Sequence, residues 1–223
     1  MKNLVGMLDV THNDPYLVRD CDKDAFDYVI DIGANTGQFS LFTRLLFPLA
    51  AIHSYEPCSI TYNLLCENLS GFERINIVNK ALGNGEPFYF KPSGGRSQTC
   101  TGNMFKPYDT SGYKIDSITL DNIFKDIDTT KNVLLKIDCE GGEIYIMDDK
   151  YNDILQSCKQ AVIEIHFNPI SKPEEKFSNF RDLPDWEVYN DWIHGVFENT
   201  HDIIYHYSNK HKGVGHYVMK IKK

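Results

Sequence analysis

Four ionisable side chains in the second half of the sequence could take part in proton transfer. Asp138 and Glu140 follow one short apolar run, and Glu164 and His166 end the next one. If both runs are parallel strands, their carboxyl ends meet at one edge of a sheet, which is where open α/β sheets bind ligands. A carboxylate or an imidazole at that edge could remove a proton from a hydroxyl group. Asp138, Glu140 and His166 are therefore candidate catalytic residues, with Glu164 beside them.

Lys136 is the fifth candidate, because it interrupts an otherwise apolar strand two residues before Asp138. The two-residue period of a strand places both side chains on one side, and a buried ammonium group needs a partner. Structural alternatives stay open: Asp138 could only pair with Lys136 or with helix amides, and His166 could be a solvent-exposed strand end. Carboxylates and a histidine could also hold Mg²⁺. No ligand spacing here specifies a metal site, so a divalent metal is possible but is not predicted.

A glycine-containing loop near the N-terminus, residues 31–37, has the sequence Asp-Ile-Gly-Ala-Asn-Thr-Gly and lies between a strand pattern and a helix pattern. Gly33 and Gly37 allow a sharp turn and a close approach to a ligand. A dinucleotide loop usually contains a third glycine and binds a pyrophosphate. Asp31 would repel a phosphate, whereas it would attract the sulfonium and amino groups of S-adenosylmethionine. The charge pattern therefore favours this methyl donor.

Glu56 ends the following strand pattern, 25 residues after Asp31. A carboxylate near this spacing accepts hydrogen bonds from the hydroxyl groups of an adenosine ribose, although NAD enzymes share the spacing. The structural alternatives are a turn-stabilising role for Asp31 and a helix-capping role for Glu56.

The spacing of apolar residues predicts an α/β fold: a Rossmann-like, mostly parallel sheet with helices on both faces. Residues 208–215 separate the last two strand patterns, which is too short for a crossover helix, so the sheet should end in an antiparallel hairpin. The expected strands are 28–31, 51–55, 75–78, 133–138, 161–166, 203–207 and 216–221; the expected helices are 38–47, 59–69 with Ser59 as the N-cap, and 143–157.

The length of 223 residues, with 42% hydrophobic content, suits one domain over residues 1–223. A net charge of −8 argues against a nucleic-acid partner. Six cysteines without a CxxC pair indicate reduced thiols, and the absence of a signal peptide or a long apolar run indicates a cytoplasmic protein without a membrane partner. Its oligomeric state is not indicated. We expect a lead-in over 1–26, inserted β segments and a loop over 84–120, and a lid over 168–195.

These motifs together resemble the FkbM family of methyltransferases. The resemblance extends from about residue 27 to 167, with its motifs in the family's order, which makes it specific. Gly142 departs from it, since the family commonly has alanine there. The similar segments are 31–40, 55–57, 81–84, 119–121 and 135–143.

The resemblance implies a class I methyltransferase fold with seven strands, the last of them antiparallel. It also implies methyl transfer from S-adenosylmethionine to a hydroxyl of a sugar or polyketide-like molecule, so that the partner would be a small-molecule or glycan acceptor. Asp138 would contact the donor or the acceptor. By position in the motifs, the methionine part would face Asp31, Gly33, Asn35 and Gly37, the ribose Glu56, and the adenine Ala81 or Leu82.

Two other functions remain open from the sequence. An NAD-linked oxidoreductase or epimerase would use the same sheet and the same ribose carboxylate, although the loop's missing glycine and Asp31 argue against it. A ligand-binding domain without turnover would keep the donor pocket.

Trp186 and Trp192, within the expected lid, could stack on a sugar ring.

Overall fold

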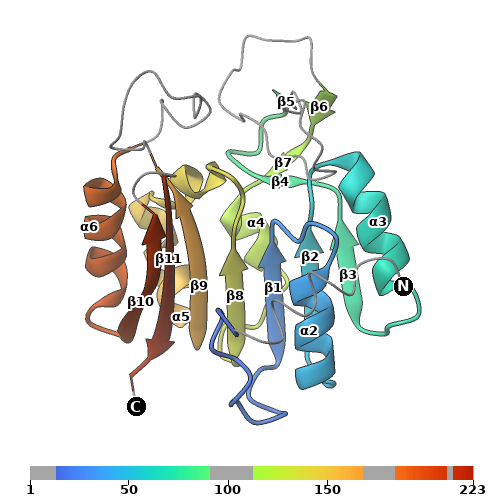
Figure 1. Cartoon of the computed structure of the whole chain (residues 1–223), viewed down its shortest axis with the longest axis horizontal. Helices are drawn as coiled ribbons and strands as arrows, with labels where there is room; N and C mark the ends of the chain where they lie inside the picture. Colours follow the sequence, from blue (N-terminus) through green and yellow to red (C-terminus); the bar gives the residue numbers. More distant parts are fainter. Residues whose placement is uncertain (1–13, 91–112, 168–183, 210–212, 223) are drawn as a thin grey trace.

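A seven-stranded sheet forms the middle layer of the structure (Figure 1), a computed structural model that describes residues 14–90, 113–167, 184–209 and 213–222. From one edge to the other, the strands are β3 (Ile75–Val78), β2 (Ala51–Tyr55), β1 (Tyr28–Ile32), β8 (Val133–Ile137), β9 (Gln160–His166), β11 (Val214–Ile221) and β10 (His201–Asn209). Neighbouring strands from β3 to β9 are parallel, whereas β11 is antiparallel to both of its neighbours. The expected fold class is confirmed.

Apolar layers cover both faces of the sheet, and successive side chains of β1 point alternately into the one layer and the other. Val29 packs with the first helix and with residues of the lead-in, whereas Ile30 and Ile32 pack in the larger core on the other face. On the first face lie α2 (Gln38–Leu46) and α3 (Ser59–Leu69); on the second lie α4 (Leu120–Phe124), α5 (Asn152–Ser157) and α6 (Trp186–Phe197).

The order of the strands reverses between β1 and β8. From β1 the chain proceeds outward through β2 to β3, and it then returns to place β8 on the other side of β1. At such a switch point the two connections diverge, and open α/β sheets bind ligands in a crevice beyond the carboxyl ends of the strands. We therefore expect the ligand crevice at the edge where the glycine loop after β1 and the acidic segment after β8 lie.

Two small sheets lie beyond this carboxyl edge, at the top of Figure 1. The β segments expected in the insertion are confirmed at both of its ends, whereas its central part, residues 91–112, lies outside the described residues. One sheet pairs β4 (Ala81–Leu82) with β7 (Ser117–Ile118), and the other pairs β5 (Phe88–Phe90) with β6 (Tyr113–Ile115).

The continuous helix expected over 143–157 is wrong. The segment forms two short 3-10 helices, η1 (Gly142–Ile146) and η2 (Asp149–Tyr151), before α5. The side chain of Asp148 accepts a hydrogen bond from the backbone N–H of Lys150 and starts η2 afresh, which interrupts the expected helix. Ser59 is also not the N-cap of α3, because that position belongs to Cys58, whose N–H donates to the carboxylate of Glu56 at 2.9 Å.

The lid expected over 168–195 is wrong for its second half. Residues 168–183 lie outside the described residues, but α6 follows as a helix of the main core. Tyr189 and Ile193 are completely buried, and Trp186 and Trp192 pack against the same cluster. The tryptophans therefore belong to the packing of α6.

The cysteines agree only in part with the expectation of reduced thiols. Cys21, Cys66, Cys139 and Cys158 are free, whereas Cys58 is disulfide-bonded. In the part of the chain that the structure describes, no helix has both the length and the apolar character needed to cross a bilayer.

A buried arginine closes the carboxyl end of α2. The guanidinium of Arg44 donates hydrogen bonds to the carbonyls of Phe47, Pro48, Ala50 and Arg74 over 2.7–3.2 Å. These carbonyls belong to the turn from α2 to β2 and to the residue before β3. One side chain thus satisfies backbone acceptors from two connections, the turn from α2 to β2 and the loop from α3 to β3.

We predict that Arg44→Met lowers the free energy of unfolding by about 2–3 kcal/mol, because it leaves buried carbonyls without donors. Urea unfolding of the purified protein measures this. Arg74→Met is the matched control: the Arg74 side chain is exposed, so its loss should cost less than about 0.5 kcal/mol. Equal effects of the two variants would contradict the structural role of Arg44.

Candidate active site

A buried ion pair joins the two strands at the switch point. Asp31 and Lys136 are directly opposite each other in the register of β1 and β8. The Lys136 ammonium lies 3.2 Å from Asp31 Oδ1, and Asp31 Oδ2 accepts a 2.6 Å hydrogen bond from Ser40 on α2. Asp31 is completely buried and Lys136 nearly so. The predicted partner of Lys136, Asp138, is also near, at 3.7 Å.

The same ammonium holds the glycine loop. Lys136 donates to the carbonyl of Gly33 at 2.7 Å and to that of Ile32 at 3.4 Å. Burial alone would lower the pKa of Lys136, but the carboxylates of Asp31 and Asp138 outweigh burial and raise it. Lys136 is therefore a cation at neutral pH. Its ammonium group contacts the carboxylates of Asp31 and Asp138 and the carbonyls of Ile32 and Gly33.

Gly33 is required by a neighbouring backbone. Its φ is +78°, and a Cβ atom at this position would lie 1.7 Å from the carbonyl oxygen of Asp138. The loop after β1 and the segment after β8 therefore touch at Gly33. Gly37, with a φ of +90°, is packed against the side chains of Leu65 and Leu69 of α3.

Glu56 links the glycine loop to the end of β2. One carboxylate oxygen accepts a hydrogen bond from the N–H of Asn35 and the other from the N–H of Cys58, both at 2.9 Å. Burial raises the pKa of Glu56, and these two hydrogen bonds oppose the increase. Asn35 is in the left-handed region, with a φ of +51°. The carboxylate is thus fixed beside the glycine loop, with further lone pairs available to accept hydrogen bonds.

The remaining predicted donor contacts, Ala81 and Leu82, form β4. Both side chains are buried, and Leu82 belongs to the main core. Their predicted contact with an adenine stays a prediction.

Beyond β8, a turn with two left-handed residues presents the predicted acids. Glu140 has a φ of +54° and Gly141 one of +103°. Glu143, whose side chain is completely buried, accepts hydrogen bonds from the N–H groups of Cys139 and Gly141, both at 2.9 Å. Glu143 therefore stabilises the turn, while Asp138 and Glu140 keep partly exposed side chains.

His166 lies against three carboxylates. Its Nδ1 is 3.3 Å from Glu143 Oε1, and its Nε2 is 3.5 Å from Glu140 Oε2 and 3.6 Å from Glu164 Oε1. Burial alone would lower the pKa of His166, but Glu143, then Glu140 and Asp138, outweigh burial and raise it to about 10. The imidazole is therefore protonated at neutral pH. In this state it cannot accept a proton from a substrate.

Glu164 has a carboxyl group whose pKa is raised into the neutral range. Burial and the charge of Asp138 raise the pKa of Glu164 to about 7, against the opposing effect of His166. The structure thus brings together the four predicted residues Lys136, Asp138, Glu140 and His166, and it places Glu164 in the same cluster.

Asp138, Glu140 and His166 each offer a ligand atom within 4.8 Å of the others. Two cations of the protein already occupy the cluster, since Lys136 lies beside Asp138 and the imidazolium of His166 lies beside Glu140. A divalent ion would have to displace the Nε2 proton and face the ammonium group. We therefore assign no metal ion to these residues.

Tyr16 is a neighbour of the site that the sequence did not indicate. Its ring lies 4.6 Å from that of Phe39 on α2 and 6.1 Å from that of His216 on β11. Burial raises the pKa of Tyr16 to about 12, and Lys136, Asp138 and Glu164 are among the charges that act on its hydroxyl. The lead-in, described from residue 14, thus covers the sheet next to the acid cluster. No sequence motif could reveal this, because the contacts depend on how the lead-in folds back.

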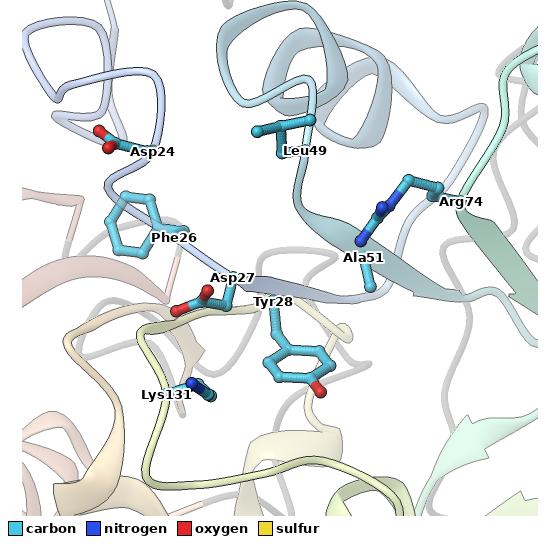
Figure 2. Close-up of a pocket in the computed structure, with 8 residues that line it drawn as sticks. All are labelled: Asp24, Phe26, Asp27, Tyr28, Leu49, Ala51, Arg74 and Lys131. Carbon is cyan, nitrogen blue, oxygen red and sulfur yellow. The ribbon is translucent and has the colours of Figure 1, made fainter.

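A separate shallow pocket lies at the opposite, amino-terminal edge of the sheet (Figure 2). It has a volume of about 240 Å³ and mixes acidic, basic and apolar side chains. None of the predicted site residues lines it. Its lining residues are Asp24, Phe26, Asp27, Tyr28, Leu49, Ala51, Arg74 and Lys131.

The methyltransferase FkbM domain profile matches residues 31–189, which is more than two thirds of the chain and includes the glycine loop and the acid cluster. The chain belongs to the FkbM methyltransferase family. The resemblance inferred from the sequence motifs is therefore confirmed.

Known proteins similar to this FkbM methyltransferase share its fold more than its sequence. The methyltransferase sdnD of Sordaria araneosa is 40% identical over 43 residues, which is 19% of this chain and 17% of that protein. A methyltransferase FkbM from Methylobacillus flagellatus KT superimposes with a TM-score of 0.53 at 14% identity, covering 96% of this chain and 52% of that one. A putative rRNA methylase from Clostridium thermocellum gives 0.56 at 9% identity, covering 96% of both chains. The match thus spans about a sixth of the Sordaria protein, and the chain spans about half of the Methylobacillus protein.

We predict that Lys136→Met lowers the free energy of unfolding by about 3–5 kcal/mol, because it leaves the carboxylate of Asp31 buried without a counterion. The double variant Lys136→Met, Asp31→Leu should recover most of that loss, since it removes both charges. Urea unfolding of both variants gives the comparison. A double variant that is less stable than the single one would show that the ion pair is not the reason for the loss.

Proposed function

We propose that this FkbM methyltransferase binds S-adenosylmethionine in the crevice between β1 and β8 and transfers its methyl group to a hydroxyl oxygen of a small-molecule or glycan acceptor. The observation that carries the proposal is the fixed carboxylate of Glu56. It is held by backbone N–H groups from the glycine loop and from the end of β2, where a ribose can donate both hydroxyls to it. The residues present therefore fit an adenosine ligand.

Electrostatics favour the cationic donor over a dinucleotide. The only cations of the described acid cluster, Lys136 and His166, are already paired with carboxylates, so they offer little to a phosphate. Asp138 and Glu140 leave negative charge at the crevice. Asp31 contributes indirectly: it neutralises Lys136, which in turn holds the carbonyl of Gly33 and shapes the loop.

Bound S-adenosylmethionine supplies an activated methyl group, so that a new O–C bond forms while the S–C bond breaks. The chain has to align the acceptor and accept the hydroxyl proton. Because His166 is already protonated, the proton acceptor is a carboxylate at the ends of β8 and β9. Asp138 has the best position among the predicted residues, since it adjoins the glycine loop and is partly exposed. Glu140, Lys136 and His166 position it and set its charge environment.

We predict that the purified protein binds S-adenosylmethionine and S-adenosylhomocysteine but not NAD in a calorimetric titration. Glu56→Ala should weaken the affinity for both sulfur ligands at least about ten-fold, because the two ribose hydroxyls lose their acceptor. Glu67→Ala, which removes an exposed carboxylate of α3, is the matched control and should leave affinity unchanged. Binding of NAD with no binding of either sulfur ligand would overturn the proposed function.

An acceptor screen with isotope-labelled S-adenosylmethionine would identify the substrate. With that acceptor, Asp138→Asn should lower kcat about 100-fold or more, whereas donor affinity should fall less than about ten-fold, since the change removes a proton acceptor. Asp153→Asn, an exposed change on α5, should have no effect. A wild-type kcat for Asp138→Asn would exclude this residue as the base.

A further inference from the structure

We infer that the partly exposed acids Asp138, Glu140 and Glu164, here named the open acids, make the donor site selective for positive charge, so that S-adenosylmethionine is held and its neutral product S-adenosylhomocysteine is released. Glu164 sets the strength of this selectivity. The inference rests on the proposed function, because it assumes that these two ligands bind in the crevice. It gives a role to Glu164, which the proposed transfer chemistry does not use.

The first step of the argument is the balance of charge. Five carboxylates contact two cations at distances between 3.2 and 3.7 Å. Two of the carboxylates lie around Lys136 and three lie around His166. Two pairs are buried and nearly neutral: Asp31 with Lys136, and Glu143 with His166. The side chains of the open acids are instead 35%, 36% and 34% exposed, for Asp138, Glu140 and Glu164 in that order. The excess negative charge is therefore on the accessible side.

The second step is the location of this charge. The carbonyl oxygen of Asp138 lies against Gly33, and Lys136 bridges the side chain of Asp138 to the Gly33 carbonyl. Asp138 thus adjoins the loop that would hold the methionine part of the donor, and Glu140 and Glu164 lie near enough to interact electrostatically with Asp138. The two ligands share every group except the sulfonium, which becomes a neutral thioether on methyl transfer. A charged cluster at this position acts on that difference and on nothing else in the pair.

The third step is the pH dependence that Glu164 should confer. Its pKa of about 7 results from burial and the neighbouring Asp138 and Glu140, against His166 and Lys136. His216 lies across from it on β11 and Tyr16 lies over the same face. A cation favours the ionised form and lowers this pKa, so binding releases a proton near neutrality. Affinity for a cationic ligand should therefore rise from pH 6 to pH 8, and affinity for a neutral one should not.

The test is calorimetry with three ligands at pH 6 and pH 8: S-adenosylmethionine, S-adenosylhomocysteine, and sinefungin, a stable analogue with a protonated amine in place of the sulfonium. For the wild type at pH 8, both cationic ligands should bind about ten-fold more tightly than S-adenosylhomocysteine, and this preference should shrink at least about three-fold at pH 6. Titrations in two buffers of different ionisation enthalpy should show proton release with the cationic ligands only.

Glu164→Gln should reduce the preference at pH 8 and remove its pH dependence, with unchanged affinity for S-adenosylhomocysteine as the sign of an intact fold. Glu140→Gln is the matched control, because Glu140 has nearly the same exposure as Glu164 and lies at nearly the same distance from His166 Nε2. It should reduce the preference and retain the pH dependence. Should Glu164→Gln fail to fold, the wild-type pH series and proton release still decide the matter.

The outcomes separate the two proposals. If the wild type binds none of the three ligands, the proposed function fails. If it binds all three with equal affinity at both pH values, or if Glu164→Gln keeps the full pH dependence, the charge selectivity is wrong and the donor assignment stands.

Discussion

The contact on which the site depends is the buried pair of Asp31 and Lys136. An ammonium group in the middle of a sheet is costly unless its charge is balanced and its donors are used. Here one carboxylate lies opposite it in the strand register, a second lies two residues along, and two carbonyls of the glycine loop take its hydrogen bonds. The pair therefore fixes β1, β8 and the loop between them at the point where the ligand crevice forms.

A second buried ion pair, Glu143 with His166, lies next to the first and is also balanced within the protein. Glu143 accepts two backbone N–H groups in the turn after β8 and also holds the imidazolium of His166 on β9. The first pair joins two neighbouring strands, whereas the second joins the start of η1 to β9. Because both cations are neutralised internally, the acids that remain at the surface of the crevice determine its charge. The rigid part of the site is thus neutral and its accessible part is negative.

The sequence predicted the fold well because the apolar runs of the central strands are clear signals and the gaps between them restrict the topology. It was less reliable where structure depends on side chains from distant segments. The short gap to Asp138 made it the expected partner of Lys136, whereas the closer partner, Asp31, lies 105 residues away and is set by strand register. The helix expected over 143–157 was wrong because the Asp148 cap divides it, which apolar spacing does not reveal.

The state of His166 shows the same limit for chemistry. A histidine at a strand end, judged by its ordinary pKa near neutrality, is a reasonable general base. Its protonation depends on Glu143, which the turn after β8 brings within 3.3 Å, and this approach could not be read from spacing. The types of the site residues, and the edge of the sheet at which they lie, were predictable from the sequence. The protonation states of these residues were not. The distinction matters for relatives of low identity, since a shared fold places groups at the same edge without fixing which of them carries the proton.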